Sequence, residues 1–368
     1  VTPQAANKTM GQGGFQEVEQ MNLFKDMVCY QEEVRDPSRM AEVLNRVIEK
    51  AFRGSAPAQI NVPRDYWTQV IDIELPPIVR FERQGGGKEA IENAAKLLSK
   101  AKFPVILSGA GVVLGGAIDE CKKLAEKLDA PVCNGYQHND SFPGSHPLAV
   151  GPLGYNGSKA AMELISKADV VLALGTRLNP FSTLPGYGID YWPKKATIIQ
   201  VDMNPDRIGL TKKVSVGICG DAKQVAQQIL DKLSSDAGNT GREERKNLIH
   251  KTKSAWLQTL SGLDHEEDDP GTVWNKEARE RDKDRMSPRQ AWRAIQDALP
   301  QDAIISSDIG NNCAIGNAYP TFEKPRKYLA PGLFGPCGYG FPAILGAKIG
   351  CPDTCLLYTS PSPRDSRV

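Results

Sequence analysis

Short apolar runs alternate with helical patterns through the middle of this chain, and this alternation restricts its fold more than any other feature. The runs, rich in Val, Ile and Leu, begin at Pro104, Pro131, Asp169, Ala196 and Val214. Helices are expected over 88–102, 115–128 and 221–233. Strands separated by helices need crossover connections, so the pattern predicts an α/β fold with a doubly wound parallel sheet.

A glycine-rich turn follows the first of these strands, as in dinucleotide-binding folds. Gly109-Ala-Gly111 has the first two glycines of that fingerprint, but Leu114 follows three residues later and the third glycine is missing. The next strand ends at Cys133-Asn134, without an acid for a ribose hydroxyl. The sequence therefore argues against an NAD site. After that strand, Tyr136-Gln-His-Asn-Asp140 gathers polar groups in a loop, where ligands often bind.

Two segments farther along the chain predict a site for an anionic cofactor. The first is an apolar strand from Ala303 that ends in Asp308-Ile-Gly-Asn-Asn, and ligands bind at the carboxyl edge of such strands. The second, 332–347, is a glycine-rich turn that runs into a helix of small residues. Its glycines let the backbone approach a ligand, and we expect the helix to offer free N–H groups to an anion. One such segment alone would indicate only a turn.

These segments resemble a known family. Asp308-Ile-Gly-Asn-Asn, Lys327-Tyr-Leu and Gly335-Pro-Cys-Gly-Tyr-Gly-Phe-Pro-Ala are similar to the diphosphate-binding domain of thiamine-diphosphate enzymes of the acetolactate-synthase type. The likeness extends from Val1 to about Asp353. It implies a three-domain architecture, with thiamine diphosphate and Mg²⁺ as cofactors. The positions that match cofactor-binding residues are Gly310, Asn311, Asn312, Gly335, Cys337 and Gly338.

The resemblance and the linker-like stretches together divide the chain. The expected parts are the C-terminal part of a pyrimidine-binding domain (1–80), a central Rossmann-like domain (86–235), a charged connector (236–285), the N-terminal part of a diphosphate-binding domain (286–353) and an unrelated polar tail (354–368). The resemblance implies truncation at both ends. The activating glutamate would precede Val1 and the Mg²⁺ ligands would follow Asp353, so no catalytic or metal residue is assigned.

Within this family, the likeness is greatest to the branch that acts on sulfoacetaldehyde. It implies conversion of sulfoacetaldehyde and phosphate to acetyl phosphate and sulfite, in taurine or sulfonate catabolism, by an enzyme of which this fragment alone would be inactive. One alternative is an acetolactate synthase-like carboligase with FAD, because Leu174-Gly-Thr-Arg-Leu-Asn179 matches a flavin-contacting loop of those enzymes. The branch implied here is not expected to need FAD. Another alternative is a non-catalytic nucleotide-binding module.

Four further polar residues are considered for the substrate. Gln16 lies in a stretch that resembles a loop near the family's substrate channel. Arg177 and Lys159 are candidates for a sulfonate or phosphate, with Arg177 preferred for its bidentate guanidinium, and either would serve equally as an ion-pair partner. His138 has the residue type for acid–base chemistry, but an ordinary loop histidine is the preferred interpretation.

Composition excludes several classes. With 368 residues the chain is long enough for about two or three domains. Its net charge of +1 provides no basic surface for nucleic acid, and no apolar run approaches the roughly 18 residues of a membrane span. Eight singly scattered cysteines and the absence of a signal-peptide pattern indicate reduced thiols in the cytoplasm. The resemblance implies a homodimer or homotetramer.

Overall fold

The computed structural model describes residues 1–77, 82–264, 286, 288–332 and 334–359. The chain forms two compact units, Val1–Glu82 and Arg83–Val368. Each is described below by itself. The predicted domain boundaries are not tested by this division and stay a prediction.

The first unit contains a small parallel sheet with helix α2 packed on it. Strand β3 lies between β1 and β2. The elements are β1 (Thr2–Gln4), α1 (Gln20–Phe24), β2 (Tyr30–Glu33), α2 (Met40–Gly54) and β3 (Ala58–Pro63). Asp36-Pro37 is a helix-start signal in the sequence, and the structure agrees: Asp36 caps the turn that leads into α2, accepting the Ser38 N–H at 2.9 Å, and Pro37 takes the first position. Val43 and Val47 of α2 are buried against Ile60 and Val62 of β3.

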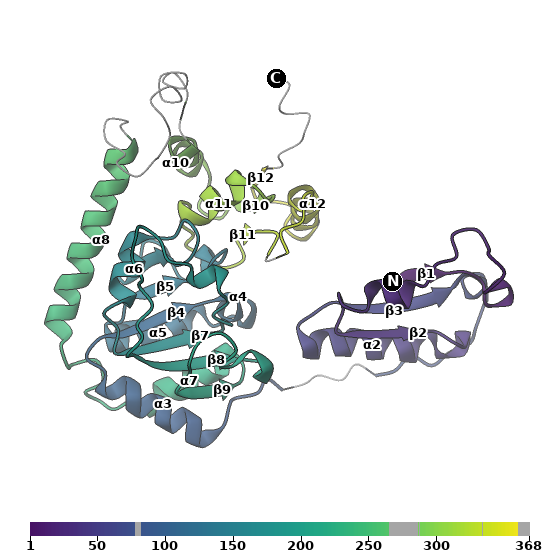
Figure 1. Cartoon of the computed structure of the whole chain (residues 1–368), viewed down its shortest axis with the longest axis horizontal. Coiled ribbons are helices and arrows are strands. Elements are labelled where there is room, and N and C mark those ends of the chain that lie inside the picture. Colours follow the sequence, from purple (N-terminus) through teal and green to yellow (C-terminus); the bar gives the residue numbers. More distant parts are fainter. Residues whose placement is uncertain (78–81, 265–285, 287, 333, 360–368) are drawn as a thin grey trace. The chain divides into compact units, whose positions relative to one another are not determined.

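The second unit is built around a sheet of six parallel strands in the order β6-β5-β4-β7-β8-β9 (Figure 1). The strands are β4 (Pro104–Ser108), β5 (Val132–Asn134), β6 (Ala149–Pro152), β7 (Val170–Leu174), β8 (Thr197–Asp202) and β9 (Val216–Cys219). The helices beside them are α3 (Lys88–Lys100), α4 (Ala110–Gly115), α5 (Ile118–Leu128), α6 (Lys159–Ile165) and α7 (Ala222–Lys232). The predicted α/β doubly wound fold is confirmed. The sequence analysis missed β6 and α6.

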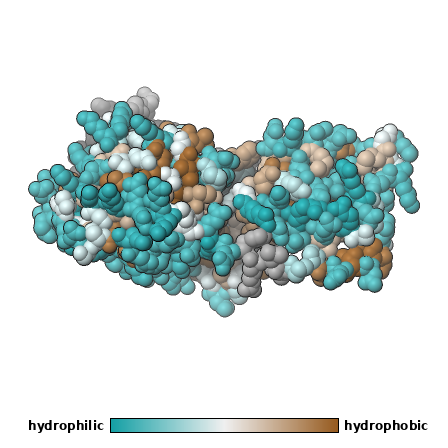
Figure 2. Space-filling model, turned by 90° about the horizontal axis from the view of Figure 1, so that it is seen from below, coloured by the Kyte–Doolittle hydropathy of each residue, from teal (hydrophilic) through white to brown (hydrophobic). Residues whose placement is uncertain are grey.

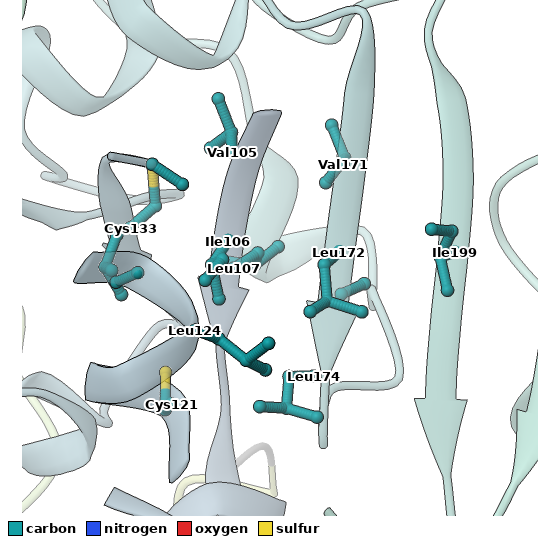
Figure 3. Close-up of a cluster of buried hydrophobic side chains, with 14 of the residues drawn as sticks. Val105, Ile106, Leu107, Cys121, Leu124, Cys133, Val171, Leu172, Leu174 and Ile199 are labelled. Carbon is teal, nitrogen blue, oxygen red and sulfur yellow. The ribbon is translucent and has the colours of Figure 1, made fainter. Parts of the chain in front are cut away.

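The strand order has a switch between β4 and β7. From β4 the chain runs by α5 to β5 on one side, and from β6 it returns by α6 to β7 on the other. Because such crossovers are right-handed, α5 and α6 lie on opposite faces of the sheet. Figure 3 shows Leu124 of α5 extending toward Leu174 of β7, within a core that also holds Ile106 and Leu172. This rigid core supports the loops at the carboxyl edge.

Part of the predicted charged connector is instead packed on the central domain. Helix α8 (Arg242–Asp264) runs beside α6, and its residue Arg245 is almost completely buried. The Arg245 guanidinium donates to the main-chain oxygens of Lys102, Leu128 and Asp129, as well as to Gly238 and Thr240. The sequence of this segment also predicts a short amphipathic helix through Leu248, Trp256 and Leu260, and α8 includes these positions. One inward-facing arginine can satisfy several buried carbonyls, which suits a highly charged helix to packing on the domain. Residues 265–285 lie outside the described residues.

A second, three-stranded parallel sheet follows, in the order β11-β10-β12. Its elements are α10 (Pro288–Ala298), β10 (Ile304–Ser307), α11 (Asn311–Ala318), β11 (Tyr328–Leu329), α12 (Gly340–Gly350) and β12 (Leu356–Thr359). The sequence predicts a helix here that is capped by Ser287 and buries Trp292, Ile295 and Leu299. Trp292 is buried and Ile295 and Leu299 pack beside it, whereas Ser287 lies outside the described residues.

The predicted tail is wrong over its first residues. Leu356–Thr359 pairs with β10 as a parallel strand, whereas 354–368 had been predicted as an unrelated polar tail. Four residues of high strand propensity, Leu-Leu-Tyr-Thr, follow α12 at the length of a crossover connection, and this outweighs the Ser-Pro pairs beyond them. Residues 360–368 lie outside the described residues.

The molecular surface agrees with the composition. Hydrophilic residues cover most of the face seen in Figure 2, and the apolar areas on it are separate. In the part of the chain that the structure describes, no helix combines the length and the apolar character needed to cross a membrane. All eight cysteines are free in the structure.

Candidate functional site

Asp308 is the first polar residue beyond the central strand of the second sheet, and its carboxylate is buried. It is 1% exposed. Its two oxygens accept the Gly338 N–H at 3.0 and 2.9 Å, and Oδ2 accepts the Gly340 N–H at 3.3 Å. Oδ1 also accepts the Ile309 N–H at 2.9 Å. One carboxylate therefore joins the end of β10 to the start of α12, about thirty residues farther along the chain.

This contact corrects the expectation that α12 offers free N–H groups to an anion. The first N–H groups of a helix have no partner within the helix, and Tyr339, at the N-cap, gives no side-chain cap to α12. Asp308 supplies the cap instead, and its negative charge is stabilised there by the helix dipole. The prediction failed because an internal carboxylate reaches the donors that were assigned to a ligand.

The start of α11 is a different helix end. Gly310 precedes the helix with φ of 125°, a conformation that favours glycine, and it provides no side-chain cap. Asn311 is exposed at the first helical position, while the Asn312 amide donates to the Asp308 carbonyl at 3.3 Å. Main-chain N–H groups and an exposed amide at this end suit a diphosphate.

The glycine-rich turn lies against the same strand end. Gly335 has φ of 60°, and a Cβ built on it would lie 3.1 Å from Cδ1 of Ile309. Gly338 has φ of 84° but open space around it, so its conformation rather than crowding favours glycine. Cys337, between them, is exposed with a free thiol. The structure thus brings the two predicted segments together at the carboxyl edge of β10.

The polar loop after β5 is used for packing between the two sheets. The Gln137 N–H donates to Oδ1 of Asn317, and the Asn139 amide donates to the carbonyls of Asn317 and Pro320. Asp140 accepts the Lys327 N–H at 3.1 Å, and burial raises the pKa of its carboxyl. These contacts, rather than a bound ligand, account for its concentration of polar side chains.

His138 and Arg177 lie close enough to interact electrostatically. Burial, with a smaller contribution from the Arg177 charge, lowers the pKa of His138 to about 4. His138 is therefore neutral near pH 7 and poorly suited to act as an acid there, which agrees with the preferred interpretation of it as a structural loop residue. Arg177 is exposed overall, but partial desolvation of its guanidinium, together with the charge of Arg207, lowers its pKa. Arg177 belongs to this cluster at the edge of the central sheet.

The glycines after β4 and β7 pack against each other at the switch point of the central sheet. A Cβ on Gly109 would lie 2.6 Å from the Gly175 carbonyl oxygen, and one on Gly111 would lie 2.6 Å from Gly175 Cα. The Gly111 N–H donates to the Gly175 carbonyl at 2.8 Å. Close contact between two loops therefore explains these glycines without a dinucleotide.

The remaining candidates are less informative. Gln16 lies in the first unit, exposed and with φ of 61°. Lys159 makes an exposed ion pair with Glu163 at 3.8 Å, the ordinary alternative foreseen for it. Among the described residues, no group of three or more His, Cys, Asp and Glu side chains could hold a metal ion.

Sequence reasoning noticed Asp308 but missed what its side chain contacts, and it did not single out Asn317. An acid directly after a buried apolar strand is itself a signal, because a carboxylate there must find donors nearby. Asn317, which is fully buried and donates to the Tyr155 carbonyl at 3.5 Å, had no comparable signal in the sequence.

Comparisons with known proteins agree with the two-sheet architecture. The central domain of thiamine pyrophosphate enzymes matches residues 91–229, and the C-terminal thiamine pyrophosphate binding domain of these enzymes matches residues 308–359. The second match includes strand β12.

Several curated proteins are similar to 96% of the chain. A probable sulfoacetaldehyde acetyltransferase of Rhizobium meliloti and a sulfoacetaldehyde acetyltransferase of Roseovarius nubinhibens are each 79% identical to it. A probable acetolactate synthase large subunit of Methanocaldococcus jannaschii is 31% identical. The chain spans 60%, 59% and 58% of these three relatives, respectively.

Proposed function

Because this chain belongs to the thiamine pyrophosphate enzymes, we propose that it serves the conversion of sulfoacetaldehyde and phosphate to acetyl phosphate and sulfite. The supporting observation is a sequence identity of 79%, over 96% of the chain, to relatives that carry the name sulfoacetaldehyde acetyltransferase. The acetolactate synthases, at 28–31%, are more distant. A role in taurine or sulfonate catabolism in the cytoplasm is part of the proposal.

The proposed cofactors are thiamine diphosphate and Mg²⁺. The diphosphate would lie at the start of α11, where Gly310 is exposed and gives no side-chain cap, and where Asn311 and Asn312 carry amide groups. When bound, thiamine diphosphate would supply a nucleophilic carbon for the reaction with the aldehyde, and the protein would supply orientation and electrostatics.

The chain's own residues would hold the cofactor in a defined place. Gly335, with positive φ, allows the turn to pass close to Ile309 and brings the backbone of the turn to the end of β10. Cys337 and Gly338 would lie along the ring part of the cofactor. Gln16 and Arg177 stay predictions as substrate contacts.

A chimaera provides the test. Residues 1–353 of this chain would replace the matching segment of the Roseovarius nubinhibens protein, which is 79% identical over 354 residues. We expect sulfite and acetyl phosphate to be formed from sulfoacetaldehyde only when phosphate, Mg²⁺ and thiamine diphosphate are all present. The unchanged relative, assayed in parallel, controls for the quality of the preparation.

Other outcomes would point elsewhere. Conversion of pyruvate to acetolactate without sulfite, especially with the absorbance of a bound flavin, would replace this proposal by a carboligase. Folded chimaera with neither activity, beside an active relative, would favour a non-catalytic role. Light scattering would test the proposed homodimer or homotetramer on the same sample.

A further inference from the structure

We propose that Asp308 is a positioning residue that fixes the glycine-rich turn and directs the cofactor's phosphates to α11. Its carboxylate accepts the Gly340 N–H, the first of α12, and the Gly338 N–H just before the helix, so its negative charge lies where a second anion would approach this end of α12. The identity of the anion as a diphosphate rests on the proposed function. The contacts of Asp308 at the start of α12 come from the structure alone.

The hydrogen bonds to Asp308 show why an aspartate fits this position. The Gly338 N–H reaches both carboxylate oxygens, the Gly340 N–H reaches Oδ2, and the Ile309 N–H reaches Oδ1. These three partners are all donors, and a carboxylate can accept them with both of its oxygens. An asparagine of the same shape would turn an N–H₂ group toward one of these donors and leave it without an acceptor.

Asp308 also offsets part of the conformational entropy lost when the glycine-rich turn becomes ordered. Gly335 and Gly338 have positive φ, a backbone conformation that residues other than glycine rarely adopt. Two bonds from a buried anion tie the turn to β10 instead of leaving it to the loop's own contacts. Hydrogen bonds to a charged partner are stronger than neutral ones, and burial strengthens them further.

Two helix ends therefore meet at the carboxyl edge of β10 with different occupants. The start of α12 holds the chain's own carboxylate, whereas α11 begins at Gly310 without a side-chain cap. A second anion near Gly338 would be repelled by Asp308. This asymmetry would place the phosphates at α11 and leave the turn to contact another part of the cofactor.

Amide hydrogen exchange on the chain itself tests the positioning role. With ¹⁵N-labelled glycine, the Gly338 and Gly340 amides should exchange slowly in the parent and roughly tenfold to a hundredfold faster in Asp308→Asn, the factor expected for lost hydrogen bonds to a charge. The matched control is Asp302→Asn, an exposed residue six positions earlier. Equal exchange in both variants and the parent would overturn the proposal.

Two additions keep the test decisive. If Asp308→Asn does not fold, the parent alone decides, because exchange of Gly338 and Gly340 at the rate of an unstructured glycine would refute the contact. Titration of the parent with inorganic pyrophosphate should leave the Gly338 and Gly340 signals in place, and their displacement would refute the exclusion of a second anion from this end of α12. Failure of the chimaera to use thiamine diphosphate, with slow exchange retained, would remove the proposed function and leave Asp308's positioning role intact.

Discussion

In the proposed cofactor site, Asn311 and Gly335 would contribute by different physical means. Asn311 is an exposed amide at the start of α11, whereas Gly335 matters for the side chain that it lacks. A hydrogen bond to a charged phosphate oxygen contributes roughly 1.5–3 kcal/mol. A β-branched residue at φ of 60° is strained wherever it occurs, and here it would also meet Ile309.

We therefore predict weaker cofactor binding in two variants of the chimaera. Asn311→Ala should raise the Kd of thiamine diphosphate roughly tenfold to a hundredfold, and Gly335→Val should raise it at least as much. Calorimetric titration at fixed Mg²⁺ measures both. His138→Ala is the control and should change the Kd little. Unchanged affinity in both test variants would mean that the site lies elsewhere.

The low pKa of His138 predicts a pH-dependent stability. Its folded-state pKa of about 4 lies below the ordinary 6.5, so its contribution is complete above pH 6.5 and is lost as the pH falls toward 4. Between pH 7 and 4 the parent chain should therefore lose about 3 kcal/mol more unfolding free energy than His138→Gln. Asp140, whose pKa burial raises, contributes with the opposite sign and is common to both proteins.

Urea unfolding across this pH range measures the difference between parent and variant. His250→Gln, an exposed residue of α8, is the matched control and should follow the parent. Parallel stability curves for the parent and His138→Gln would show that His138 is not buried in its neutral form.

At the scale of elements, helix caps and one buried arginine hold the layers in place. Ser158 caps α6 by accepting the Ala161 N–H, and Asp221 caps α7 by accepting the Lys223 and Gln224 N–H groups. Helix α8 is joined to the central domain by Arg245, whose donors satisfy carbonyls at the ends of other elements. Removing such a donor leaves several buried oxygens without partners.

Arg245→Met should accordingly lower the unfolding free energy by roughly 3 kcal/mol, since the methionine fills much of the space but donates nothing. Chemical denaturation followed by circular dichroism measures this loss. Lys251→Met, on an exposed position of the same helix, should change stability by less than about 0.5 kcal/mol. Equal effects of the two substitutions would rule out the special role of Arg245.

At the scale of the second unit, the loop after β5 couples the two sheets. Asn317 receives the Gln137 N–H and contributes its carbonyl to Asn139, and all three residues are buried. The exposed Ser145 makes a neighbouring contact of the same kind, with Glu323 at 2.7 Å. Buried polar contacts of this sort are costly to break, because water cannot replace the lost partner.

Asn317→Ala should therefore let the β11-β10-β12 sheet open more readily than the central sheet. We expect amides of β10 to exchange at least tenfold faster, while those of β4 and β7 keep their protection. Ser145→Ala should leave both sheets nearly unchanged. Hydrogen exchange with mass spectrometry measures the two regions in one experiment, and equal loss of protection in both sheets would indicate that they open as one unit.

Much of this architecture could be predicted from local pattern. The periods of apolar residues defined β4, β7 and β8 and their helices, because strand and helix spacing are properties of neighbouring residues. The pairing of the segments around Asn311 and Gly335 was expected from a family resemblance. The sequence analysis missed β6, α6 and β12, whose runs are short or end in turn residues.

By itself, then, the sequence determined the class of fold, the alternation of the central sheet, and the segments where a cofactor site would form. The tertiary structure decided which groups meet: Asp308 with Gly338 and Gly340, Arg245 with the carbonyls of Lys102 and Leu128, and Asn317 with the loop after β5. These pairs are separated by about thirty to one hundred and eighty residues. The spacing of residues in the sequence does not indicate such pairs. Each pair depends on how whole layers pack, and on which buried donors and acceptors then need partners.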